Sequence, residues 1–150
     1  MSRTMEDVRT FAGADQGLAV VSFGRPDQSV HSSLVNAGVM RHPVTGEEVV
    51  ALVVRSSAVK LRHWRRTPRA TVVFRSGWSW VCVEGATTII GPDDRFDGFD
   101  PSSVPRVLRD VFVAAGGSHD DWDEYDRVMA AERRTAVFVH PTRITGVGQP

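Results

Sequence analysis

The sequence predicts a mainly β fold with short inserted helices: an antiparallel barrel of about seven strands in a single domain, residues 1–150. Three observations predict it. The chain has 150 residues and 41% apolar side chains, which is close to the average for one globular domain. Short runs rich in valine and aromatic residues recur along it, separated by Gly, Pro and Asp. Stretches with helical spacing are few and short, and there are no internal repeats.

The N-terminal third predicts a short helix followed by a three-stranded meander. A helix is expected over residues 4–11, because Thr4 can cap it, Glu6 and Asp7 suit its positive end, and Gly13 ends it. The strands of the meander are expected at residues 17–23, 29–39 and 49–54. The last of them is an uninterrupted apolar run, which indicates a strand buried on both faces.

The middle of the chain predicts a helix and a long hairpin. Ser56 or Ser57 can cap a helix that continues to about residue 66, where the Thr-Pro pair at residues 67–68 ends it. Strands are expected at residues 70–74 and 78–90. Because side chains alternate along a strand, Trp78 and Trp80 are expected to face the same way.

The C-terminal third predicts two helices and two closing strands. The acidic, turn-rich segment 91–101 is expected to be a loop. Helices are expected from about Ser102 or Ser103 to residue 115, and from about residue 120 to residue 133. Residues 135–139 and 143–147 predict two strands separated by Pro141, which completes the count of seven.

Charge and cysteine content exclude several classes of protein. Eighteen basic and eighteen acidic residues give a formal net charge of zero, which argues against a protein built to coat nucleic acid or an anionic membrane. A lone cysteine, Cys82, leaves no disulfide framework, and the five histidines show no metal-ligand spacing. No segment has the length or hydropathy of a signal peptide or a membrane span. We therefore expect a cytoplasmic protein without a metal site.

The positive charge is concentrated in one part of the chain. Residues 49–83 contain no acidic side chain and carry a formal charge of +7, whereas the remainder carries −7. Of the eighteen basic residues only Lys60 is a lysine. A strand that ends beside Arg55 and leads through serines into a helix bearing Lys60 is typical of a phosphate site. The open alternatives are a solvated basic face paired with the acidic segment, and stacking of nucleic acid bases on the tryptophans.

The sequence contains no P-loop, nucleophile elbow or dinucleotide fingerprint. If the protein is an enzyme, a bound cofactor is therefore expected to supply the reactive centre.

Two segments resemble a known family. They are RSSAVKLRHWRRTPRA at residues 55–70 and GWSWVCVEG at residues 77–85. They are similar to the pyridoxamine 5′-phosphate oxidase-like split β-barrel superfamily, and most to its branch of flavin- and deazaflavin-dependent oxidoreductases from actinobacteria. Residues 125–144 resemble the closing helix and strands of that family.

The resemblance implies an FMN-binding-like split barrel that forms a homodimer with cofactor sites at the subunit interface. It assigns the grip on the cofactor phosphate to Arg55 and Lys60, with Ser56 and Ser57 adding donors. The segment that contains Ser33, Val35 and Asn36 is expected beside the ring. Trp78 is expected near the cofactor or the interface, and Arg134 or Arg133 near an anionic tail.

The function implied is an F420-dependent oxidoreductase that transfers a hydride between the deazaflavin and a small organic substrate. The alternatives are an FMN-binding flavoprotein of the pyridoxamine phosphate oxidase type and a cofactor carrier without turnover. The predicted partners are a second copy of the chain and a small-molecule substrate, without nucleic acid or membrane.

Overall fold

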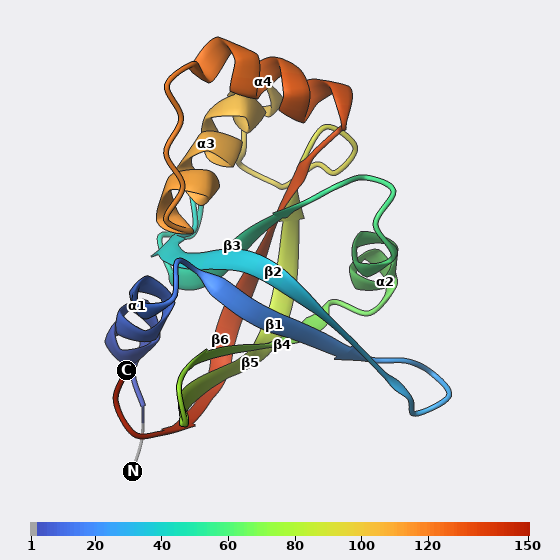
Figure 1. The fold of residues 1–150 in the computed structure, drawn as a ribbon. Coiled ribbons are helices and arrows are strands. Elements are labelled where there is room, and N and C mark those ends of the chain that lie inside the picture. The colour runs from blue at the N-terminus through green and yellow to red at the C-terminus, as the bar shows by residue number, and fades with distance from the viewer. Residues whose placement is uncertain (1–2) are drawn as a thin grey trace.

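The computed structural model describes residues 3–150, which form a closed antiparallel barrel with strand order β1-β2-β3-β6-β5-β4 (Figure 1). The strands are β1 (Leu18–Gly24), β2 (Val30–Arg41), β3 (Glu48–Val54), β4 (Arg69–Ser76), β5 (Ser79–Ile90) and β6 (Thr135–Val147). The helices are α1 (Met5–Ala14), α2 (Val59–Arg66), the 3₁₀ turn η1 (Pro101–Ser103), α3 (Val104–Ala114) and α4 (Trp122–Ala131). The predicted mainly β barrel with inserted helices is confirmed, and the three-stranded meander is β1-β2-β3.

The strand count of seven is wrong, because β6 is one strand that runs through Pro141. Opposite this residue the pairing with β5 shifts register between Glu84 and Gly85, and Thr142 is the extra residue on β6. Its hydroxyl donates to the Glu84 carbonyl at 3.0 Å. Gly85 has no Cβ, which allows the His140 carbonyl to approach its backbone. A bulge of this kind tolerates the missing N–H of proline, so the strand bends without ending.

Several element ends differ from the sequence expectation. The first helix is capped by Thr4 as predicted, but it continues through Gly13 to Ala14. The second helix is not capped by Ser56 or Ser57: a turn in which the Ala58 N–H donates to the Arg55 carbonyl comes first, and α2 begins at Val59. Ser56 and Ser57 lie in that turn and therefore do not cap the helix.

Trp78 lies outside the strand to which the sequence assigned it. It occupies the turn between β4 and β5 next to Gly77, whose φ of 59° requires glycine or an equivalent left-handed residue. The expectation that Trp78 belongs to the same strand as Trp80 is therefore wrong.

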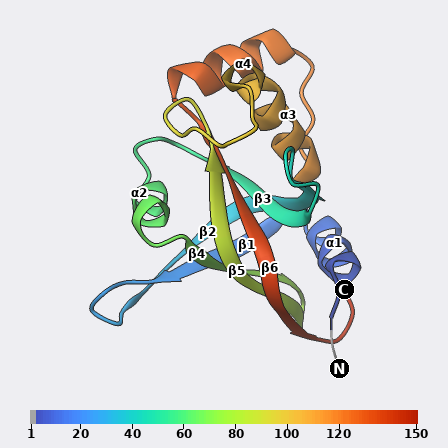
Figure 2. The same ribbon diagram turned by 180° about the vertical axis from the view of Figure 1, so that it is seen from behind.

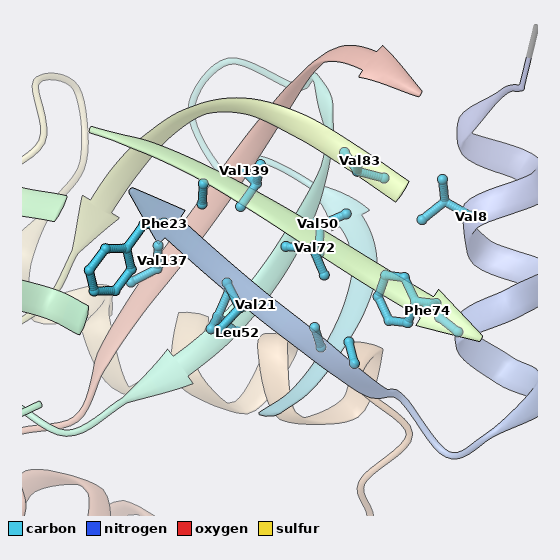
Figure 3. Close-up of a cluster of buried hydrophobic side chains, with 14 of the residues drawn as sticks. Val8, Val21, Phe23, Val50, Leu52, Val72, Phe74, Val83, Val137 and Val139 are labelled. Atoms are coloured by element: carbon cyan, nitrogen blue, oxygen red, sulfur yellow. The ribbon is translucent and has the colours of Figure 1, made fainter. Parts of the chain in front are cut away.

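The hydrophobic core has two parts that share β3. Inside the barrel, Leu52, Val21, Phe74 and Val139 belong to one buried cluster, and Val8 of α1 lies at one end of it (Figure 3). On the outside, Val49 and Ala51 pack with residues of α3, α4 and β6, such as Leu108 and Phe138. The third strand of the meander is thus buried on both faces, as its apolar run predicted.

The helices take separate places around the barrel. In Figure 1, α3 and α4 lie together above the barrel, α2 lies to one side and α1 lies near the lower end. Figure 2 shows from behind that β5 and β6 run side by side along the barrel. Among residues 3–150, no helix has the length and hydropathy needed to span a membrane.

Two glycines set the position of α3. A Cβ added to Gly38 of β2 would collide with the Ala114 carbonyl, and one added to Gly17 would collide with the Ala115 carbonyl. The C-terminal end of α3 therefore lies directly on the backbone of β2 and of Gly17, the residue before β1, which fixes one wall of the groove described next.

Candidate functional site

A groove of about 710 Å³ lies between the outer surface of the barrel and the α3–α4 pair. Its floor comes from β2 and the end of β3, its far wall from α3 and α4, and its near end from the start of α2. Segments far apart in the sequence meet here, because β3 pairs with both β2 and β6.

One end of the groove is basic. Arg55, Lys60 and Arg134 all line it. The antiparallel register of β3 and β6 pairs Val54 with Thr135, so Arg55 and Arg134 are the next opposed residues beyond the paired ends. Lys60 is the second residue of α2, and its ammonium group makes no ion pair within residues 3–150.

A carboxylate lies between the two arginines. Arg134 Nε donates to Glu132 Oε1 at 3.0 Å, and Arg55 Nη2 lies 3.2 Å from Glu132 Oε2. The Arg55 side chain is 60% exposed, whereas that of Arg134 is 23% exposed. Three cations and one carboxylate leave a formal charge of +2 at this end.

The other end of the groove is apolar and rigid. Val111, Phe112 and Met129 line it, together with Tyr125. The Tyr125 hydroxyl donates to the Leu108 carbonyl at 3.0 Å, and burial raises the pKa of Tyr125 to about 12. The phenol therefore remains protonated and joins α4 to α3, while its ring packs on Phe112 with centroids 5.0 Å apart.

Two polar residues from β2 and the segment before β1 also line the groove. Asn36 of β2 donates its side-chain N–H to the Gln16 carbonyl at 2.9 Å, which fixes the orientation of the amide. Both residues line the groove, beside Leu34 and Val35. The Asn36 amide oxygen accepts no hydrogen bond within residues 3–150 and is available to a ligand donor.

The structure brings together five of the nine residues singled out from the sequence. The groove contains Val35, Asn36, Arg55, Lys60 and Arg134. It does not contain Ser33, Ser56, Ser57 or Trp78.

Those four residues lie elsewhere for different reasons. The Ser33 hydroxyl is buried and has no hydrogen-bond partner in the described part of the chain. Ser56 and Ser57 belong to the turn before α2. Trp78 is 99% exposed and lines a separate shallow hollow with Arg75 and Trp80. In Figure 1 the β4–β5 turn lies at the end of the barrel away from α3 and α4.

Sequence reasoning missed the apolar wall and Glu132. The position of Glu132 in the sequence could have indicated a role. A carboxylate at the C-terminal end of a helix interacts unfavourably with the helix dipole, so such a residue is expected to have a compensating partner. Phe112 and Tyr125 looked like ordinary packing residues of amphipathic helices, and only the docking of α3 and α4 puts them on a groove.

The other reactive groups of residues 3–150 do not form a second site. Burial raises the pKa of the Cys82 thiol, which opposes a role as a nucleophile. Within residues 3–150, no three His, Cys, Asp or Glu side chains are arranged to hold a metal ion.

No protein-family model matches the chain. Among solved structures, a conserved hypothetical protein, Rv2991 from Mycobacterium tuberculosis, superposes with a TM-score of 0.68 at 17% identity, over 97% of this chain and 85% of that one. A pyridoxamine 5′-phosphate oxidase-related, FMN-binding protein from Nostoc punctiforme gives 0.61 at 11% identity, over 97% and 86%. An F420 reductase gives 0.57 at 13% identity, over 88% and 91%.

These similarities identify the fold. It is the split β-barrel of pyridoxamine 5′-phosphate oxidase-like proteins. At such low identity the similarity concerns the course of the chain and not the chemistry of the groove.

Proposed function

We propose that the chain is an F420-dependent oxidoreductase that transfers a hydride between a deazaflavin and a small organic substrate bound in the groove, with FMN as the alternative cofactor. The observation that carries the proposal is the groove itself, which has a cationic end and an apolar, aromatic wall. A flavin-type cofactor has the same two parts, a phosphate-bearing chain and a flat ring system. Structural similarity to an FMN-binding protein and to an F420 reductase supports this choice.

The basic residues of the groove would hold the phosphate of such a cofactor. Lys60, Arg55 and Arg134 supply the positive charge that a phosphate requires. The Lys60 ammonium, which has no ion-pair partner within residues 3–150, is the cation most available to it. Phosphates at strand-to-helix junctions are commonly held by such cations together with free backbone N–H groups.

The remaining groups orient the ring and exclude water. Val111, Phe112 and Met129 form an apolar wall that lowers the local dielectric constant. The fixed Asn36 amide presents its oxygen to a donor on the ring edge. A bound deazaflavin or flavin supplies the hydride chemistry, so this chain needs no nucleophile of its own.

We propose further that two copies of the chain associate through the outer face of β1 and β2. Four apolar side chains are exposed there, Leu18, Val20, Val30 and Leu34, and Leu18 and Leu34 also line the groove. An apolar face that is continuous with a binding groove is suited to cover by a second copy. In such a dimer Trp78, which its own chain leaves uncovered, is available to contact the second copy.

The first test is a parallel titration of the purified chain with F420 and with FMN, followed by quenching of tryptophan fluorescence. Tighter binding of F420 supports the proposed function and directs a substrate screen to electron-poor double bonds. Tighter binding of FMN supports the flavin alternative. Failure to bind either would contradict the proposal, and binding without turnover of any substrate would support a carrier.

Lys60→Ala tests the phosphate grip. We expect the affinity for the bound cofactor to fall more than tenfold, about 1.4 kcal/mol or more. The reason is that the substitution removes the ammonium group of Lys60, which has no ion-pair partner within residues 3–150. Arg62→Ala is the matched control: Arg62 is exposed, lies on the same helix, and does not line the groove. Equal affinities for the two variants would remove Lys60 from the site.

A further inference from the structure

Two arginines face each other where β3 ends and β6 begins. Arg55 and Arg134 follow directly from the Val54–Thr135 pair of the β3–β6 ladder. Like charges at opposed positions of adjacent strands are destabilising unless an anion lies between them. In this structure the anion is the carboxylate of Glu132, which contacts both guanidinium groups.

The main chain holds Glu132 at that position. The Glu132 N–H donates to the Val128 carbonyl at 3.0 Å, and the Arg134 N–H donates to the Met129 carbonyl at 2.9 Å. Between them Arg133 adopts a left-handed φ of 48° and pairs with Asp93 outside the groove. The carboxylate is therefore attached to a closed helix end, and it contacts two arginines that line the groove without lining the groove itself.

We propose that Glu132 is an internal anion that competes with the anionic group of the ligand for Arg55 and Arg134, and so determines the charge of the ligand that the groove accepts. The proposal rests on the proposed function for the nature of the ligand, a phosphate-bearing cofactor. Competition for the two guanidinium groups, however, applies to any anion that enters.

The charge balance indicates which ligands are favoured. With Glu132 in place, the basic end carries a formal charge of +2, which a doubly charged phosphate group neutralises. Without the carboxylate the basic end carries +3, and its affinity for highly charged anions rises more than its affinity for singly charged ones.

The test compares Glu132→Gln, which keeps the shape and removes the charge, with Glu124→Gln as the matched control. Glu124 lies in the first turn of α4, whose C-terminal end Glu132 caps, and it is exposed and forms no ion pair with Arg55 or Arg134. The probes are inorganic pyrophosphate, FMN and riboflavin, and the readout is calorimetric affinity at constant ionic strength. We expect Glu132→Gln to bind pyrophosphate and FMN at least about fivefold more tightly than wild type. Riboflavin, which has no phosphate, should bind all three proteins equally.

Other outcomes overturn the proposal. They are an unchanged or lower affinity of Glu132→Gln for pyrophosphate, an equal gain in Glu124→Gln, an equal gain for riboflavin, and no pyrophosphate binding by any of the three proteins. The pyrophosphate arm keeps the two proposals separate. A fivefold gain for pyrophosphate without binding of FMN or F420 would support the role of Glu132 and contradict the proposed function. Binding of FMN or F420 by wild type, without a gain in pyrophosphate affinity in Glu132→Gln, would support the proposed function and contradict the role of Glu132.

Discussion

Gly38 illustrates how the absence of one side chain positions the groove. Its backbone lies against the carbonyl of Ala114, so that no Cβ can be accommodated unless α3 moves. The same helix supplies Val111 and Phe112 to the apolar wall. The position of that wall therefore depends on a residue that the sequence presents only as a small residue within a strand.

Gly38→Ala is expected to destabilise the fold by about 3 kcal/mol and to weaken cofactor binding, because the new methyl group meets backbone and α3 must shift. Gly24→Ala is the control, since a Cβ at Gly24 meets nothing within 4 Å. Its effect should stay within about 0.5 kcal/mol. Urea denaturation of both variants measures the difference, and equal stability would show that α3 does not bear on Gly38.

Individual site residues differed in how far the sequence predicted them. Arg55 and Lys60 were predictable because local charge and chain order alone indicate an anion site. Arg134 came only from the family resemblance. Glu132 was not predicted, because its role depends on the pairing of β3 with β6, residues more than eighty positions apart.

At the level of elements, the turn between β2 and β3 depends on a histidine that must stay neutral. His42 is 2% exposed, and its Nδ1 accepts the backbone N–H groups of Val44 and Thr45, both at 3.2 Å. A proton on Nδ1 would break both hydrogen bonds. The groups that face His42 are His140, with ring centroids 5.2 Å apart, the Glu47 carboxylate that His140 contacts, and the rings of Phe96 and Phe138.

Acid is therefore expected to destabilise this turn. Burial, and then the nearby His140, lower the pKa of His42 below its ordinary value. The unfolded chain then binds the proton more readily than the folded one, so stability is complete above about pH 6.5. It falls as the pH drops from there toward the lower pKa of the folded state.

His42→Asn tests this expectation, since the asparagine oxygen can accept the same two N–H groups and does not titrate. The melting temperature of wild type should fall more steeply between pH 7 and pH 5 than that of the variant. His63, whose pKa burial also lowers, is present in both proteins and contributes to the slope that remains. Parallel slopes for the two proteins would mean that His42 does not couple protonation to folding.

Element types were predictable from the sequence, and several element boundaries were not. Alternation and apolar runs identified every strand region, whereas the start of α2 depended on the turn at Ala58 and the continuity of β6 depended on the bulge opposite Pro141. Both are decided by hydrogen bonds to particular partners, which local propensity does not specify.

At the scale of the whole molecule, the proposed dimer leads to a prediction about mass. Val20 is 41% exposed on the β1–β2 face and does not line the groove. Val20→Glu should convert the dimer to a monomer at micromolar concentration, because a buried, unpaired carboxylate at an interface is costly. Val44→Glu is the control, with a side chain that is 39% exposed in the β2–β3 turn.

Light scattering coupled to size exclusion measures both variants. A monomeric wild type, or a dimer that survives Val20→Glu, would contradict the proposed interface. Dissociation by Val44→Glu alone would place the interface at the other end of β2.

The position of β6 has a consequence for how the chain folds during synthesis. The last strand lies between β3 and β5 and pairs with both, so the cylinder cannot close before residues 135–147 have left the ribosome. Until then β3 and β5 each present an unpaired edge rich in valine and isoleucine, which is a template for association with other nascent chains. Folding is accordingly governed by distant pairings and is expected to be slow for a chain of this length. The interval before the final strand arrives is therefore when edge-to-edge association with other chains is most expected.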